Sequence, residues 1–245
     1  MARIVLVHGA FSGAWWWEPV LPALRATGHT IETFDLPGAG DDPTPVADVS
    51  LPGYAERICG ELAAGPPAVL VGHSMGGMAV TQAAARCPEQ VAALVYIGAF
   101  APAPGQSLGE LITWPEAAGD SVQANLVVEG DPPIGILPAE AAPDALFNCC
   151  DAEQAAWASA KLGPQPVRPF GDPVQLDEAA REAFERIPRA YIVCTQDRAI
   201  SPAMQRRMLA QIGCDPVLEL DADHWPWVSA EDGFVAAIDR LASSH

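Results

Sequence analysis

Ser74 lies in a short glycine-rich segment whose spacing suits nucleophilic chemistry, Val71-Gly72-His73-Ser74-Met75-Gly76-Gly77. An apolar run at 68–71 precedes the serine and an alanine-rich helical pattern follows it, which predicts a tight turn between a strand and a helix. The flanking glycines lack a Cβ, so the strand and the helix can close around the turn and leave the hydroxyl exposed. The amide of Met75 and the positive end of the helix then face the space where an oxyanion would form. This pattern, a nucleophile elbow, is typical of acyl transfer.

A second serine matches the same pattern, G-x-S-x-G, in the segment 105–109. It follows Pro102 and Pro104 rather than an apolar run, so a loop is predicted there. The pattern alone is a weak signal, because glycine is common enough to produce chance matches. The predicted strand and helix on either side of Ser74 therefore favour Ser74 as the nucleophile.

A serine hydroxyl needs a general base, and histidine has the unperturbed pKa that suits this task. His224 follows the last predicted strand in Asp221-Ala222-Asp223-His224-Trp225, at the sheet edge where the ends of parallel strands meet the turn at Ser74. We therefore predict that His224 is the base. The other histidines are assigned other roles: His8 shapes the turn after the first strand, His73 points back into the sheet as packing, and neither His29 nor His245 is placed to act.

A carboxylate must orient the imidazole and stabilise its charged form. Asp197 lies just after the penultimate predicted strand, in a loop that can reach His224. The order Ser74, Asp197, His224 along the chain matches a known order of nucleophile, acid and base. Asp221 and Asp223 are the alternatives because they are close to His224 in sequence. Neighbours on one short loop project in different directions, so loop hydrogen bonding is their predicted role.

The loop after the first predicted strand, Gly9-Ala10-Phe11-Ser12-Gly13, can place a second backbone amide beside that of Met75. Ala10 is the predicted donor, and Phe11 is the alternative. With these groups in place, Ser74 would attack an ester carbonyl while His224 takes its proton, and the two amides would hold the tetrahedral oxyanion. His224 would then protonate the leaving alcohol, and water would repeat the cycle on the acyl-enzyme.

Short apolar runs alternate with helical patterns along most of the chain, which predicts parallel strands joined by crossover helices. The rhythm stops after residue 100, where prolines become frequent, and it resumes at about residue 189. We therefore predict an α/β fold in which residues 1–100 and 189–245 form the core and residues 101–188 form an inserted cap, or lid. The predicted strands are 4–7, 31–34, 68–71, 93–97, 191–194 and 217–220, and the predicted helices are 16–25, 54–63, 75–86, one after Ser201-Pro202, and 231–241.

The chain has 245 residues, of which 31 are acidic and 13 basic, and its formal net charge is −18. This charge repels phosphate backbones and anionic lipids, so neither nucleic acid nor a membrane is expected as a partner. No apolar run approaches the length of a membrane span and no leader pattern precedes the first strand, which predicts a soluble, cytoplasmic protein. The six cysteines lack the spacing of a metal site and are predicted to be free or buried thiols rather than disulfides, with redox activity as the alternative for the vicinal pair Cys149-Cys150.

Three stretches together resemble the α/β-hydrolases, in particular the subgroup of plant methylesterases, hydroxynitrile lyases and related bacterial esterases, including pyrethroid-hydrolysing ones. They are VHGAFSGAW (7–15), GHSMGG (72–77), and CTQDRAI (194–200) with ADH (222–224). The resemblance implies a mainly parallel six-stranded sheet flanked by helices, a small helical cap, no cofactor, a buried acyl-transfer site and often a homodimer. Hydroxynitrile lyases of this kind have a lysine directly after the catalytic histidine, whereas this chain has Trp225, so cyanohydrin cleavage is not expected.

The substrate pocket is expected between the first loop, the turn at Ser74 and the cap. No lysine or arginine is evident there, so the predicted substrate is a small-molecule carboxylic ester that is uncharged, moderately bulky and moderately hydrophobic. A lactonase or amide hydrolase would use the same residues, and a small-ligand-binding protein with little turnover is the rival from another class. The predicted lining residues are apolar, with ordinary packing beneath the cap as the alternative for at least half of them: Phe11, Trp15, Leu111, Ile112, Trp114, Leu126, Phe147, Trp157 and Trp225.

Overall fold

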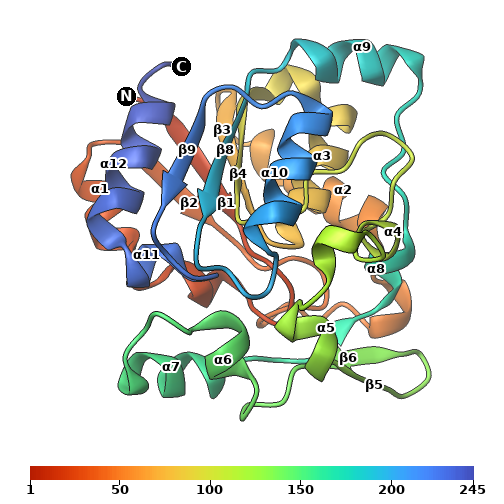
Figure 1. The fold of residues 1–245 in the computed structure, drawn as a ribbon. Coiled ribbons are helices and arrows are strands. Elements are labelled where there is room, and N and C mark those ends of the chain that lie inside the picture. The colour runs from red at the N-terminus through yellow and green to blue at the C-terminus, as the bar shows by residue number, and fades with distance from the viewer.

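A computed structural model describes residues 1–245, and its centre is a sheet of six strands in the order β2-β1-β3-β4-β8-β9 (Figure 1). Every pairing in this sheet is parallel, so the predicted α/β fold is confirmed. The central strands β1, β3, β4 and β8 are mostly apolar and buried, which is typical of parallel strands covered on both faces, whereas the edge strands β2 and β9 are partly exposed. The strands are β1 (Arg3–Val7), β2 (Thr30–Thr33), β3 (Ala68–His73), β4 (Val91–Ile97), β8 (Arg189–Cys194) and β9 (Val217–Leu220).

Helices cover both faces of the sheet and bury its alternate side chains (Figure 1). Along β1, Val5 and Val7 join the core cluster with α2, α3 and α10, whereas Ile4 and Leu6 join the cluster with α1 and α12. The two-residue period of a strand thus supplies one hydrophobic layer to each face. The core helices are α1 (Leu21–Ala26), α2 (Leu51–Leu62), α3 (Gly76–Arg86), α10 (Pro202–Ile212), α11 (Pro226–Ser229) and α12 (Glu231–Ala242), with 3-10 turns η1 (Ala14–Trp17), η2 (Val46–Asp48) and η3 (Pro88–Gln90).

Residues 101–188 leave the sheet after β4 and return at β8, and much of this insertion lies beyond the carboxyl ends of the strands (Figure 1). The prediction of a helical cap is incomplete, because the insertion also holds a three-stranded antiparallel sheet, β5-β6-β7. These strands are two or three residues long, too short to show a period in the sequence. The elements are α4 (Leu108–Leu111), η4 (Pro115–Ala117), α5 (Ser121–Asn125), β5 (Val127–Glu129), β6 (Ile134–Ile136), α6 (Ala142–Leu146), α7 (Ala152–Ser159), β7 (Gln165–Pro166), α8 (Arg168–Gly171) and α9 (Glu178–Arg186).

Helix α9 falls within the range predicted for the cap but lies at the opposite end of the molecule from α5, α6 and α7 (Figure 1). It packs against α3, and Phe184 and Ile187 belong to the core cluster on that face of the sheet. The last part of the insertion therefore runs back along the core, and only the earlier part covers the ends of the strands.

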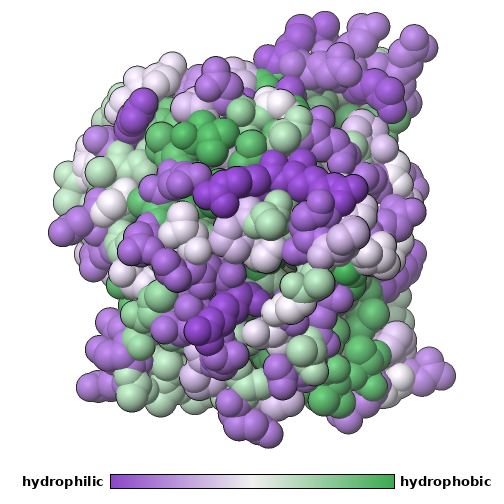
Figure 2. All heavy atoms as spheres, in the orientation of Figure 1, coloured by the Kyte–Doolittle hydropathy of each residue, from purple (hydrophilic) through white to green (hydrophobic).

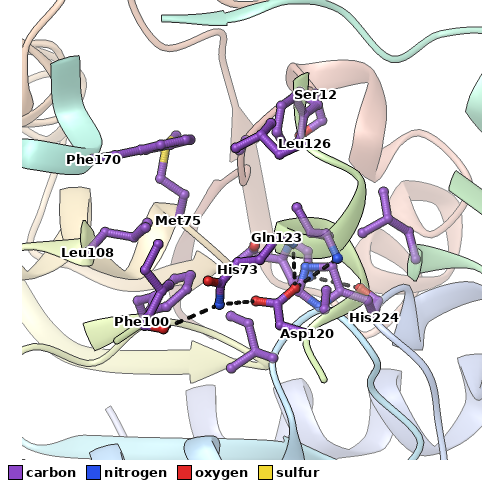
Figure 3. Close-up of a pocket in the computed structure, with 18 of the residues that line it drawn as sticks. Ser12, His73, Met75, Phe100, Leu108, Asp120, Gln123, Leu126, Phe170 and His224 are labelled. Atoms are coloured by element: carbon purple, nitrogen blue, oxygen red, sulfur yellow. Dashed lines mark hydrogen bonds between the residues drawn. The ribbon is translucent and has the colours of Figure 1, made fainter. Parts of the chain in front are cut away.

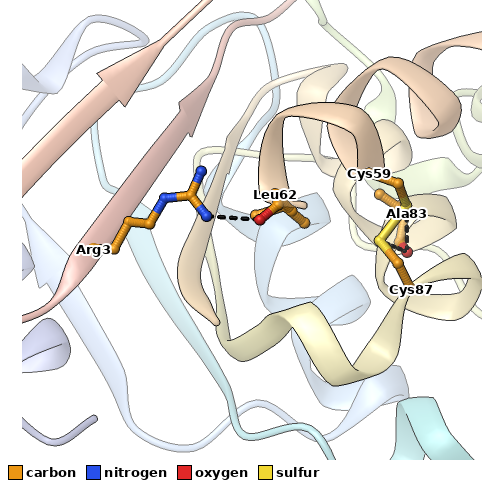
Figure 4. The surroundings of a disulfide bond; sticks show 5 residues. All are labelled: Arg3, Cys59, Leu62, Ala83 and Cys87. Atoms are coloured by element: carbon orange, nitrogen blue, oxygen red, sulfur yellow. Dashed lines mark hydrogen bonds between the residues drawn. A yellow bond between two sulfur atoms is a disulfide. The ribbon is translucent and has the colours of Figure 1, made fainter. Parts of the chain in front are cut away.

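A disulfide joins Cys59 of α2 to Cys87 at the end of α3, so the prediction of free thiols is wrong for these two residues (Figure 4). The two helices pack side by side and bring the Cα atoms of the pair to 6.1 Å, a distance that a disulfide spans. The residues are 28 positions apart, so their proximity is a result of helix packing rather than of spacing. The prediction is right for the remaining cysteines, which are free: Cys149, Cys150, Cys194 and Cys214.

The face shown in Figure 2 mixes hydrophilic and hydrophobic side chains, with hydrophilic ones over α9 and a hydrophobic patch over β5. On β5, Val127 and Val128 are 46% and 53% exposed. None of the helices combines the length and the apolar character needed to cross a lipid bilayer.

Candidate active site

Ser74 occupies the turn between β3 and α3, and its φ of 55° places it in the left-handed region that residues with a Cβ rarely adopt. The predicted strand, turn and helix are thus present. Glycine is required on both sides: a Cβ at Gly72 would lie 2.6 Å from Cγ2 of Val80, and one at Gly76 would lie 2.5 Å from the carbonyl oxygen of His8. The local sequence therefore forces the serine out of the strand and toward the loop that follows β1.

The loop after β1 lies directly against the serine. A Cβ at Gly9 would come within 2.7 Å of Cβ of Ser74, so only glycine fits there. Beyond Gly9, the amides of Ala10 and Met75 donate to no acceptor in the chain, whereas the amide of Phe11 donates to Oε1 of Gln165 at 3.4 Å. The two free amides flank Ser74 in one cavity, which favours Ala10 over Phe11 as the partner of Met75 in an oxyanion hole.

His224 and Asp197 meet at the carboxyl ends of β9 and β8. Nδ1 of His224 donates to Oδ2 of Asp197 at 2.8 Å, and both side chains are buried. This bond fixes the tautomer, because a proton on Nδ1 leaves Nε2 as the acceptor nitrogen. His224 and Ser74 line the same cavity without a hydrogen bond between them, a looser arrangement that is common at the nucleophile and base before substrate binds.

Asp197 is held by further donors. Its Oδ1 accepts from the amides of Ala199 and Ile200 at 2.8 and 2.9 Å, and its Oδ2 also accepts from Nε2 of Gln205 at 3.2 Å. Gln205, on α10, is fully buried and was not predicted from sequence. The signal for it is a glutamine on the apolar face of the helix that follows the aspartate loop, where a buried amide needs partners.

The two alternative carboxylates do not reach the imidazole. Asp221 accepts from the side chains of Thr195 and Gln196. Asp223 accepts from the amide of Trp225, from the hydroxyl of Ser229 and from the amide of Cys149. Both therefore have the predicted role of hydrogen bonding within loops, and Asp223 in addition connects the His224 loop to Cys149 of the insertion.

Electrostatics favour a charged imidazolium at His224. Burial acts to lower the pKa of His224, but the charge and hydrogen bond of Asp197 and the charges of Asp223 and Asp120 outweigh it, so the pKa lies above its ordinary value. Burial, together with the nearby His224, holds the pKa of His73 well below its ordinary value. The base can thus take up a proton while the adjacent histidine stays neutral.

The other histidines divide between confirmed and corrected roles. His8 shapes the first loop as predicted, because its Nδ1 donates to the Gly9 carbonyl and its Nε2 accepts from the Leu36 amide. The prediction that His73 only packs against the sheet is wrong. Its ring lies 4.5 Å from that of His224, and its Nε2 donates to the His224 carbonyl at 2.9 Å. This contact joins the end of β3 to the loop after β9, two segments that are distant in sequence, so no local pattern reveals it.

The catalytic candidates open onto a cavity with mostly apolar walls (Figure 3). Of the predicted lining residues, Phe11, Ile112 and Leu126 line it. The sequence prediction missed several others, namely Trp16, Phe100, Leu108, Leu146 and Phe170, together with the polar Asp120 and Gln123. Phe100 follows the carboxyl end of β4, a position that the sequence could have indicated.

Six predicted lining residues lie elsewhere, and packing explains each of them. Trp225 and Phe147 are buried against Trp16, whose ring takes the place nearer the cavity. Trp157 stacks on the outer side of Trp225, is 40% exposed and contacts Trp15 edge to face. The remaining two are Leu111 and Trp114. Leu111 is fully buried in the core, and Cζ of Arg207 lies 4.0 Å from the centroid of the Trp114 ring in a cation–π contact.

No group of three or more histidine, cysteine, aspartate or glutamate side chains is arranged to hold a metal ion. The cavity wall contains no lysine or arginine, and its hydrogen-bonding side chains are two serines, two histidines, one aspartate, one glutamine and the indole of Trp16. The arrangement of a strained serine, a carboxylate-bound histidine and two free amides is suited to attack on a carbonyl carbon.

The chain belongs to the alpha/beta hydrolase family, whose sequence profile matches residues 4–237. It is 29% identical over 243 residues to polyneuridine aldehyde esterase of Rauvolfia serpentina, covering 93% of this chain and 90% of that protein. It is 30% identical over 260 residues to probable esterase PIR7A of Oryza sativa subsp. japonica, covering 99% and 97% of the two chains. Among solved structures, a pyrethroid hydrolase from Sphingobium faniae JZ-2 superposes with a TM-score of 0.86 at 26% identity over 99% of this chain and 98% of that one.

Proposed function

We propose that this protein is a serine hydrolase that cleaves uncharged, moderately hydrophobic carboxylic esters through an acyl-enzyme on Ser74. The observation that carries the proposal is the meeting of three features at one cavity: the strained Ser74, the hydrogen-bonded His224 and Asp197, and the free amides of Ala10 and Met75. Each feature destabilises the folded chain: Ser74 through backbone strain, Asp197 through a buried charge, and the two amides through unsatisfied donors. A role in acyl transfer explains why all three are present.

In the first half of the reaction, the hydroxyl oxygen of Ser74 attacks the ester carbonyl while Nε2 of His224 accepts the hydroxyl proton. The amides of Ala10 and Met75 stabilise the negative charge on the former carbonyl oxygen. Asp197 stabilises the imidazolium that forms. His224 then gives its proton to the leaving alcohol, and the acyl group remains on Ser74.

In the second half, His224 takes a proton from water, whose oxygen attacks the acyl-enzyme. The same two amides hold the second oxyanion, and the proton returns to the oxygen of Ser74 as the carboxylic acid leaves. His73 contributes indirectly, since its bond to the His224 carbonyl holds the loop that carries the base.

The lining of the cavity supports a neutral ester as the substrate. Thirteen of the nineteen lining residues are hydrophobic, and no lysine or arginine is present to pair with a free carboxylate or a phosphate. Relatives named as esterases over nearly the whole chain favour the same reaction class. A lactone or an amide would use the same residues, and a comparison of substrates separates these reactions from ester hydrolysis.

The proposal is tested with p-nitrophenyl acetate, butyrate and octanoate, measured with the wild type, Ser74→Ala and a matched control, Ser107→Ala. Ser107 is the serine of the second G-x-S-x-G pattern, and in the structure it caps α4. We expect Ser74→Ala to lose at least about 10⁴-fold in kcat, because the nucleophile is removed. The Ser107→Ala variant should keep its turnover.

A fluorophosphonate probe followed by intact-mass analysis gives a second readout. The wild type and Ser107→Ala should each gain one adduct, and Ser74→Ala should gain none. Folded wild-type protein that neither turns over esters nor takes the label would overturn the proposal. That result would support a ligand-binding role for the cavity.

A further inference from the structure

One wall of the cavity carries a carboxylate that the proposed mechanism does not use. Asp120 precedes α5 in the cap, its side chain faces the cavity, and it is 8% exposed (Figure 3). It is the only acidic residue among those that line the cavity. No lysine or arginine forms an ion pair with it, and the cavity wall offers none.

The hydrogen bonds of Asp120 favour its ionised form. Oδ1 accepts from the amides of Val122 and Gln123 at 2.8 and 3.0 Å, and Oδ2 accepts from Nε2 of Gln123 at 3.1 Å. All three partners are N–H donors, so a protonated acid would have no acceptor among them. Burial raises the pKa of Asp120 above its ordinary value, while these donors and the charge of His224 act in the opposite direction.

Capping of α5 does not require a charge at this place. Asparagine caps a helix about as well as aspartate, and the helix has only five residues. Helices α7 and α9 of the insertion are also preceded by capping aspartates, Asp151 and Asp177, but both are exposed to water, where a charge costs little. Asp120 alone holds its charge against an apolar cavity wall, where a like charge on a bound molecule is poorly screened.

We propose that Asp120 sets the charge selectivity of this cavity, so that it accepts neutral or cationic acyl groups and rejects carboxylates, including the acid that the reaction produces. This inference rests on the proposed ester hydrolysis. Hydrolysis of a neutral ester creates an anion inside a cavity that already contains a fixed anion. Repulsion between the two charges promotes release of the product and limits product inhibition.

The other titratable groups near His224 either are neutral or do not face a bound acyl group, so Asp120 is the residue that would select its charge. Asp197 faces His224 from the loop after β8 and is bonded to its ring. Asp223, on the same loop as His224, is directed to Trp225, Ser229 and Cys149. His73 faces His224 from β3 and is neutral. Of the carboxylates whose charge acts on His224, only Asp120 lines the cavity that the acyl group would enter.

The test compares three inhibitors of similar shape and different charge: phenylacetate, phenylacetamide and 2-phenylethylamine. Inhibition constants are measured against p-nitrophenyl butyrate for the wild type, Asp120→Asn and the control Asp177→Asn, at a pH where the amine is protonated. Asp177→Asn removes one negative charge from an exposed helix cap and keeps the capping group. For the wild type we expect phenylacetate to bind about tenfold more weakly than the amide.

In Asp120→Asn, the inhibition constant of phenylacetate should fall about tenfold and that of the amine should rise, while the value for the amide changes less than about twofold. Asp177→Asn should match the wild type for all three compounds. A purely structural role for Asp120 would change the three constants together. Wild-type protein that binds phenylacetate as tightly as phenylacetamide overturns the inference without any variant.

Failure of the inference and failure of the proposed function are distinguishable. If the wild type hydrolyses esters but the inhibition constants do not depend on the charge of the inhibitor, only the proposed role of Asp120 is rejected. If the wild type has no esterase activity, the proposed function fails, and the same three compounds are ranked by the thermal stabilisation that they give. If Asp120→Asn does not fold, Asp120→Ser is used in its place, because serine keeps a capping oxygen without the charge.

Discussion

The two sides of the cavity are built differently. On the core side, backbone segments touch so closely that side chains are excluded: a Cβ at Gly77 would lie 2.0 Å from the carbonyl oxygen of Phe100, and one at Gly9 would lie 2.7 Å from Cβ of Ser74. On the cap side, formed by residues of the insertion, helices of four or five residues and the residues next to them present mainly separate apolar side chains such as Leu108, Leu126 and Phe170.

This difference indicates a division of roles. Reacting groups must be held within fractions of an ångström, and close backbone packing with buried hydrogen bonds achieves that on the core side. Selectivity needs only a shape and a charge, which exchangeable side chains on short elements can supply. We therefore expect changes on the core side to alter rate or stability, and changes on the cap side to alter which substrate is preferred.

The largest effect beyond loss of the nucleophile is expected from Asp197→Asn. The variant should lose about 10³- to 10⁴-fold in kcat, because the imidazole loses the partner that fixes its tautomer and stabilises its charge. His224 acts as a base only when neutral, so activity is lost as the pH falls through its pKa. Since Asp197 raises that pKa, the inflection of residual kcat/KM should move to lower pH in the variant.

The measurement is the pH profile of kcat/KM, with Asp221→Asn as the control. Asp221 is an exposed neighbour whose bonds go to Thr195 and Gln196, so its profile should coincide with that of the wild type. If Asp221→Asn loses as much activity as Asp197→Asn, the assignment of the acid is wrong.

A smaller effect, on stability alone, is expected when Cys59→Ser and Cys87→Ser are combined. Loss of a disulfide that closes 28 residues should lower the free energy of unfolding by about 3 kcal/mol, since the unfolded chain gains freedom. Urea denaturation monitored by circular dichroism measures this change. The chain-length preference on p-nitrophenyl esters should not move, because the bond lies in the core helices. A shift in that preference would contradict the division of roles.

The smallest effect is expected on the cap side, from Phe170→Ala compared with Trp157→Ala. Phe170 lies beside Leu108 and Met75 (Figure 3), so its truncation should favour octanoate over acetate by about fivefold, mainly through KM. Trp157 lies outside the cavity and should change the ratio less than about twofold. Steady-state kinetics with the two esters gives the ratio. Equal shifts in both variants would mean that the cavity extends to the outer tryptophans.

The sequence by itself determined the α/β class and the serine, aspartate and histidine candidates. Each of these rests on a local pattern: an apolar run marks a buried parallel strand, and a polar residue just after it must lie at the carboxyl edge of the sheet. Ser74, Asp197 and His224 each follow the carboxyl end of a strand, and parallel strands bring these three ends to the same edge of the sheet. The turn at Ser74 is visible in the sequence as a glycine pattern, although the contacts that require glycine at Gly76 and Gly77 are made with the carbonyl oxygens of His8 and Phe100 on neighbouring segments.

Only the tertiary structure decided which of three consecutive tryptophans faces the cavity, that Cys59 meets Cys87, and that Gln205 and Asp120 face the site. In the 3-10 turn Ala14–Trp17, adjacent side chains point in different directions, and packing against His73 and Trp225 selects Trp16. The contact of Gln205 with Asp197 spans 8 residues and that of Cys59 with Cys87 spans 28, and the geometry of both follows from how the helices dock. Local patterns indicate where the strands lie along the chain and which residues follow their carboxyl ends. The order of the strands in the sheet and the docking of side chains across elements depend on shapes that no single segment contains.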